Sequence, residues 1–170
     1  MDVATAILSW VQPVWNFMIL ATILIGFAFA GYGLKKFHQG LTEGNGPKTH
    51  EKQGFFTFVV GLFLINIKAV LDDLSMTIFN QTTQTGIAYS GGGGGQYAEI
   101  VHAAFSIISL VGLYGIISGL LILRSEKEEL WHGLRRLAGG TLAVNIVPAL
   151  TFLGGSLGGT MQAVITKLIG

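Results

Sequence analysis

The sequence contains no cysteine, only three prolines and few charged residues. Without thiols the chain has no disulfide bond, no cysteine nucleophile and no cysteine-based metal site. Charged residues make up 11% of the chain, whereas soluble domains carry about 25%. The formal net charge of +1 is too balanced to indicate nucleic-acid binding. This composition does not provide enough polar side chains for a surface that faces water.

Hydrophobic residues are abundant, at 51% of the chain, and they occur in long runs. A run of about 20 apolar residues crosses a bilayer core of about 30 Å. Four such runs predict an all-α integral membrane protein with four transmembrane helices, at residues 14–34, 54–71, 97–123 and 137–157. We also expect short amphipathic helices at residues 3–12, where Pro13 breaks the helix, and at residues 160–169.

Two stretches of the chain resemble each other. Gly61 and Gly140 each stand five residues before an Asn-Ile pair, Asn66 and Asn145, which lie 79 positions apart. Further upstream, Gly26, Ala30, Leu34 and Lys35 match Gly115, Gly119, Leu123 and Arg124 at an offset of 89. Internal repeats of this kind indicate a fold built from two copies of one unit. We therefore predict two tandem parallel helical hairpins, at residues 1–79 and 97–170, joined by a glycine-rich loop at residues 80–96.

Basic residues are concentrated in the loops within the two predicted hairpins, and the positive-inside rule places such loops in the cytoplasm. The residues concerned are Lys35, Lys36, Arg124, Arg135 and Arg136. Both termini and the five glycines at positions 91–95 then face the periplasm of a bacterial inner membrane. The N-terminus lacks the basic segment of a cleavable leader, so we expect the first span to act as its own insertion signal.

One cluster of charges, Lys68, Asp72 and Asp73, lies inside or at the border of a predicted span. Ionisable side chains at membrane depth are costly and usually face protein or water. One interpretation is a proton or ion relay. The interpretation we favour is a Lys68–Asp72 pair one helical turn apart, near the membrane surface.

Asn66 and Asn145 occupy matching positions in the two copies. Each side chain can form a hydrogen bond to a neighbouring helix, and we favour that packing role. The alternative is that both line a substrate path, with Pro148 interrupting the fourth span as in the broken helices of transporters.

Small residues in the predicted spans allow helices to approach closely. The pattern predicts helix packing at Gly26, Ala30, Gly61, Gly115, Gly119 and Gly140. Glu99 and His102 have the helical spacing of a carboxylate–histidine pair, but two ligands do not form a metal site. The sequence shows no nucleophile–base pair and no nucleotide-binding motif, so we expect no catalytic residues, no cofactor and no metal.

The layout of the chain resembles the small hydrophobic membrane proteins of type IVB secretion and conjugation systems, the IcmC/DotE and TraQ proteins. The resemblance is carried by overall size and by the last span, with Leu142, Asn145 and Pro148. Each hairpin, with its basic turn, also resembles a conjugative pilin. The chain departs from a pilin in having four apolar segments and no long leader.

This resemblance implies a non-enzymatic membrane subunit of a type IV secretion or conjugation apparatus. Such a subunit would assemble with itself or with other membrane subunits into a pilus or a pore-like oligomer, with phospholipid bound between subunits. Two alternatives stay open. One is a small ion or solute channel or transporter that uses Asn66, Lys68, Asp72 and Asn145. The other is a holin-like protein that forms membrane lesions.

Overall fold

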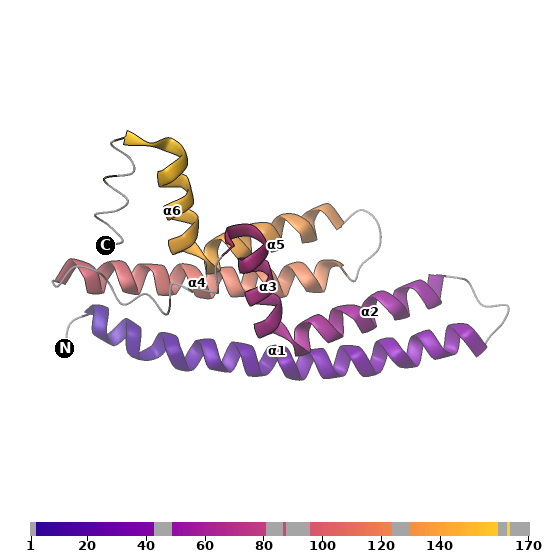
Figure 1. Cartoon of the computed structure of the whole chain (residues 1–170). Helices are drawn as coiled ribbons and strands as arrows, with labels where there is room; N and C mark the ends of the chain where they lie inside the picture. Colours follow the sequence, from indigo (N-terminus) through magenta and orange to yellow (C-terminus); the bar gives the residue numbers. More distant parts are fainter. Residues whose placement is uncertain are drawn as a thin grey trace. The chain divides into compact units, whose positions relative to one another are not determined.

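A computed structural model describes residues 3–42, 49–80, 87, 96–123, 130–159 and 163. These residues form helices and connecting turns, with no strand among them. In chain order the helices are α1 (Val3–Thr42), α2 (Thr49–Ile65), α3 (Ile67–Phe79), α4 (Gln96–Leu123), α5 (Leu130–Val144) and α6 (Ile146–Leu157) (Figure 1). The predicted all-α class is confirmed. The predicted glycine-rich loop, residues 80–96, and the C-terminal amphipathic helix lie outside the described residues, apart from Asn80, Ile87, Gln96 and Ala163.

The chain forms two compact units, each assembled from separate segments. One unit contains Met1–Asn16, Leu71–Tyr114 and Gly139–Gly170, and the other contains Phe17–Val70 and Gly115–Ala138. Within the described part of the chain, α1 and α4 are long and apolar enough to cross a membrane. The number of candidate spans rises to four if each of the pairs α2–α3 and α5–α6 counts as one span.

Helix α1 runs without interruption through Pro13, so the predicted break between a terminal helix and the first span is wrong. Proline removes one backbone donor and crowds the carbonyl four residues earlier, here that of Ser9. Apolar residues stand on both sides of Pro13, among them Val11, Val14 and Phe17, and they favour one continuous helix. Proline is tolerated within membrane helices, where other groups compensate for the lost bond.

We expect Pro13→Ala to stabilise the protein by about 1 kcal/mol, because alanine restores one backbone hydrogen bond. Pro148→Ala is the matched control, since Pro148 lies in the first turn of α6, where proline costs little. Equilibrium unfolding in detergent micelles measures both changes. A Pro13→Ala protein that is less stable than the parent would contradict the prediction.

The loop inside the first predicted hairpin is shorter than the sequence suggested. The first predicted span ends at residue 34 and the second begins at residue 54, but α1 continues to Thr42 and α2 begins at Thr49. The two helix ends pack on each other: the Phe37 and Phe55 rings lie 6.3 Å apart, and Lys36 donates a hydrogen bond to Gln53. In the second half, α5 begins at Leu130, seven residues before the predicted start of the fourth span at residue 137.

The second helix of each pair is broken at an asparagine. Helices α2 and α3 meet at Asn66 with a bend of 86°, and α5 and α6 meet at Asn145 with a bend of 89°; Figure 1 shows α6 turning away from α5. The predicted second span, residues 54–71, is therefore divided by a sharp bend at Asn66, which the sequence analysis did not predict. The interruption of the fourth span occurs at Asn145, three residues before Pro148, and not at the proline itself.

Glycines seven residues apart hold the paired helices together. A Cβ atom built on Gly26 would lie 2.9 Å from the Gly61 carbonyl oxygen, and one built on Gly33 would lie 2.9 Å from that of Gly54. The second half repeats this scheme with Gly112 against Gly140, at 2.8 Å, and Gly119 against Gly133, at 2.9 Å. Backbones this close leave no room for a side chain at these positions.

The glycine contacts show which residues of the first half correspond to which residues of the second half. Gly26 matches Gly112 and Gly33 matches Gly119, an offset of 86 residues, so the predicted offset of 89 is wrong. The difference of three residues is close to one helical turn, and both alignments therefore place small residues on the same helix face. The downstream offset of 79, from Asn66 to Asn145, agrees with the two helix breaks.

Candidate functional site at the helix breaks

The break at Asn145 combines an irregular backbone with a proline in the following turn. Asn145 has φ −101° and ψ 44°, outside the helical region. Pro148 has no N–H, so it cannot donate to the carbonyl of Val144, four residues earlier. Ser109 of α4 supplies the missing donor: its Oγ donates to the Val144 oxygen at 3.2 Å. The break is thus stabilised by a side chain from the neighbouring helix.

The Asn145 side chain is fully buried, and both ends of its amide are hydrogen-bonded. Its Oδ1 accepts a hydrogen bond from Ser75 Oγ of α3 at 2.5 Å, and its Nδ2 donates to the Thr141 carbonyl at 3.0 Å. Ser75 and Ser109 are also fully buried. We call Ser75, Ser109, Thr141 and Asn145 the buried polar cluster. Hydrogen bonds of these residues join α3 to Asn145, Asn145 to α5, and α4 to the last residue of α5.

Asn66 makes the corresponding bonds within its own helix, but its side chain is exposed. Its Nδ2 donates to the Leu62 carbonyl at 3.1 Å, just as Asn145 donates to Thr141, four residues earlier. Position 69 is alanine, so no proline accompanies this break. Asparagine side chains compete for backbone hydrogen bonds and disfavour helix interiors. The two asparagines therefore share a local scheme and differ in burial.

The charged cluster lies on α3, directly after the first break. Lys68, Asp72 and Asp73 are all exposed, and Lys68 and Asp72 lie four positions apart, on one face of the helix. Thr77 Oγ1 donates to the Asp73 carbonyl at 2.7 Å. The same helix carries Ser75, which belongs to the buried polar cluster. Ser75, which anchors α3, lies three residues after Asp72 and so adjoins the charged pair along the helix surface.

The predicted packing residues fall into two groups. Gly26, Ala30, Gly61, Gly119 and Gly140 lie at close helix contacts, because the Cβ atoms built on Gly61 and Gly112 meet Ala30 and Gly140. Gly115 is half-buried. Sequence reasoning missed Gly33, Gly54, Gly112 and Gly133. The signal that could have found them is the seven-residue spacing of glycines, which repeats in both pairs.

The residues predicted to form basic loops are helical wherever the structure describes them. Lys35 and Lys36 lie in α1, while Arg135 and Arg136 lie in α5; Arg124 lies outside the described residues. The Arg135 guanidinium stacks on the Trp131 ring, 5.2 Å from its centre. Arginine and tryptophan side chains of this kind are typical of the boundary between membrane and water.

His102 and Glu99 do not take part in a metal cluster within the described part of the chain. The His102 Nε2 atom lies 3.2 Å from the Ile87 carbonyl oxygen, and the Glu99 side chain is exposed. His102 therefore fixes the residue at position 87 to α4, as expected of a structural histidine.

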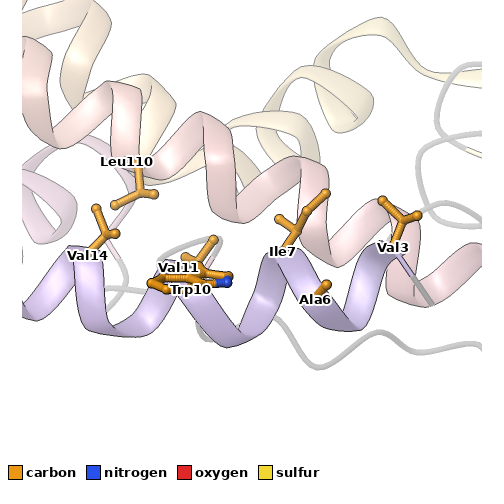
Figure 2. Close-up of a pocket in the computed structure, with 7 residues that line it drawn as sticks. All are labelled: Val3, Ala6, Ile7, Trp10, Val11, Val14 and Leu110. Atoms are coloured by element: carbon orange, nitrogen blue, oxygen red, sulfur yellow. The ribbon is translucent and has the colours of Figure 1, made fainter. Parts of the chain in front are cut away.

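A groove of about 450 Å³ lies between the N-terminal turns of α1 and the middle of α4. Its lining is apolar and comprises Val3, Ala6, Ile7, Trp10, Val11, Val14 and Leu110. Figure 2 shows Val3, Ile7 and Val14 projecting from α1 toward α4, with Leu110 opposite Val14. This surface suits contact with hydrocarbon and offers few groups for chemistry.

Comparison with protein-family models, with curated proteins and with solved structures finds no match for this chain.

Proposed function

We propose that the protein is a non-enzymatic structural subunit embedded in a membrane, which assembles with further subunits through helix packing. One observation carries this proposal. The most apolar 18-residue stretch of α1 is only 22% buried by the rest of the chain. Large apolar side chains, among them Phe17, Leu24 and Phe27, are 60–70% exposed. A long apolar helix left uncovered in this way requires lipid or another subunit to cover it.

The buried polar cluster supports a structural role. Both ends of the Asn145 amide and the Ser75 hydroxyl are used in hydrogen bonds within the chain. Such bonds fix the relative placement of helices in a membrane, where they contribute about 0.6–2 kcal/mol each. Groups engaged in this way fit an assembly scaffold better than they fit a site that binds and releases a solute.

We further propose that the chain has four spans, arranged as two tandem parallel hairpins. The repeated glycine contacts of α1 with α2 and of α4 with α5 support this arrangement. The ends of the pairs that carry Lys35, Lys36, Arg135 and Arg136 then face the cytoplasm, by the positive-inside rule. The proposed location is the bacterial inner membrane.

The assignment to a type IV secretion or conjugation apparatus is likewise a proposal. It rests on the resemblance in chain layout and in the segment containing Leu142, Asn145 and Pro148. In such an apparatus the partners would be further copies of the chain, other membrane subunits and bound phospholipid. The finished assembly would be either a fixed inner-membrane complex or a pilus.

Native gel electrophoresis after extraction in a mild detergent tests the assembly proposal. The chain has a mass of 18.1 kDa, and we expect it to migrate in a complex several times larger, beyond the mass of its bound detergent. Replacing Phe17 and Phe27 with alanine should shift the protein toward smaller species, because both rings lie on the uncovered face of α1. Alanine at Gly31, an exposed position on the same helix, is the control. A parent protein that migrates only as a monomer would overturn the proposal and favour a small channel.

A further inference from the structure

The two helix breaks lie opposite the middle of the long helices, not near their ends. Around Asn145, the Ser109 hydroxyl of α4 binds the Val144 carbonyl, and a Cβ atom built on Gly112 would lie 2.6 Å from the Val144 nitrogen. The candidate span in α4 is Ala98–Leu123, so its midpoint falls between Leu110 and Val111. Asn145 is therefore level with the centre of that span.

The break at Asn66, between α2 and α3, also lies opposite the middle of its partner helix, α1. A Cβ atom built on Gly26 would lie 2.7 Å from the nitrogen of Ile65, the last residue of α2. Gly26 lies within about one helical turn of the centre of α1, Val3–Thr42. Asn66 thus follows α2 at a level near the middle of its partner helix. The centre of a span stays at half depth even when the helix tilts.

Helix α3 is held at that level by its bond to the second break. Ser75 Oγ donates to Asn145 Oδ1 at 2.5 Å, and Asp72 and Asp73 lie within one helical turn of Ser75. The 26 residues of the α4 span extend about 39 Å, against a bilayer core of about 30 Å. A shift of the span along its axis therefore moves its centre by only about 5 Å from the midplane. The two carboxylates stay at hydrocarbon depth.

Ionisable groups at this depth are costly when they face lipid, yet Lys68, Asp72 and Asp73 are exposed on α3. Thr77 is also exposed, next to the exposed apolar side chains of Met76 and Ile78. Irregular backbone at membrane depth, as at the exposed Asn66, is tolerated where it is buried in protein or lines a water-filled cavity. The charged side chains and the irregular backbone at Asn66 therefore both require protein or water, and not lipid, beside this face of α3.

We infer that the exposed face of α3 lines a water-filled cavity at half depth of the membrane. This inference rests on the proposed function only in that α4 must cross a membrane. It adds that the second helix of each pair is interrupted inside the bilayer. The cavity is polar, with two carboxylates and one ammonium group supplied by Lys68, Asp72 and Asp73.

Labelling of single cysteines tests the inference, and the native chain helps because it contains no cysteine. A charged maleimide that does not cross membranes is applied to vesicles of both orientations that contain Asp73→Cys or Thr77→Cys. Val111→Cys is the matched control, since Val111 is 63% exposed and lies at the centre of the α4 span. The label after denaturation gives the total thiol in each sample.

We expect the Asp73→Cys and Thr77→Cys variants to react at least about tenfold faster than the Val111→Cys control from one side of the membrane, because only a hydrated thiol ionises and reacts. Rates for both α3 variants as slow as that of the control would overturn the inference and place α3 against lipid or another subunit. Rapid labelling of the Val111→Cys control as well would show that α4 does not cross the membrane. That outcome would refute the proposed membrane embedding together with the inference.

Discussion

Asn145→Ala should destabilise the protein by about 2–4 kcal/mol, whereas Asn66→Ala should change its stability by less than about 0.5 kcal/mol. The two asparagines occupy matching breaks, but only Asn145 is buried and bonded to another helix. Its removal breaks the bond to Ser75 and leaves the Ser75 hydroxyl buried without its acceptor, which adds a desolvation cost. Asn66 is exposed, and its side chain bonds only to its own helix.

Equilibrium unfolding in mixed micelles measures both effects, and a double-mutant cycle with Ser75→Ala isolates the bond itself. We expect Asn145→Ala and Ser75→Ala together to cost less than the sum of the single changes, because either change alone breaks the same bond. Equal losses for Asn66→Ala and Asn145→Ala would contradict this assignment. The assignment would also be contradicted if the costs of Asn145→Ala and Ser75→Ala were strictly additive in the double mutant.

Gly33→Ala should destabilise the contact between α1 and α2 by about 1–3 kcal/mol, the usual cost of overpacking. The added methyl group would lie 2.7 Å from the Phe58 Cα atom and closer still to the Phe58 nitrogen. Both are backbone atoms, so the helices must separate to accommodate it. Gly112→Ala should have a similar effect in the second pair, where the methyl group would lie 2.6 Å from the Val144 nitrogen.

Two neighbouring glycines provide controls for these substitutions. A Cβ atom built on Gly31 or on Gly139 meets nothing within 4 Å. Alanine there should leave the free energy of unfolding unchanged or raise it by up to about 1 kcal/mol, because alanine favours helices. The same micelle unfolding assay compares all four variants. If Gly31→Ala and Gly33→Ala behave alike, the glycine contacts do not hold the pair together.

The sequence predicted the long apolar helices well, because hydrophobic runs are a local property of the chain. It also identified Asn66 and Asn145 as a matched pair. It assigned the interruption of the fourth span to Pro148, and the break lies three residues earlier, at Asn145. The sequence did not show that Ser109 of another helix donates to the Val144 carbonyl, which Pro148 leaves without a backbone donor. A donor that comes from 35 positions away in the chain leaves no local signal.

The buried polar cluster was predicted only in part for the same reason. Ser75 is an ordinary small polar residue in sequence, and its bond to Asn145 joins positions 70 apart. The contacting glycines were more accessible to prediction. Gly26, Gly33 and Gly40 repeat every seven residues, as do Gly54 and Gly61, and such spacing keeps residues on one face of a helix.

Photolabelling from within the bilayer tests the central claim, that α1 and α4 are embedded in a membrane. A hydrophobic carbene precursor dissolved in the lipid labels side chains that face hydrocarbon, and peptide mass spectrometry locates the label. We expect label on exposed residues of the apolar helices, such as Leu24 in α1 and Val111 and Tyr114 in α4. The end of α1 beyond Lys35 should stay unlabelled. Label missing from both helices, or equally strong on residues 35–42, would contradict the account.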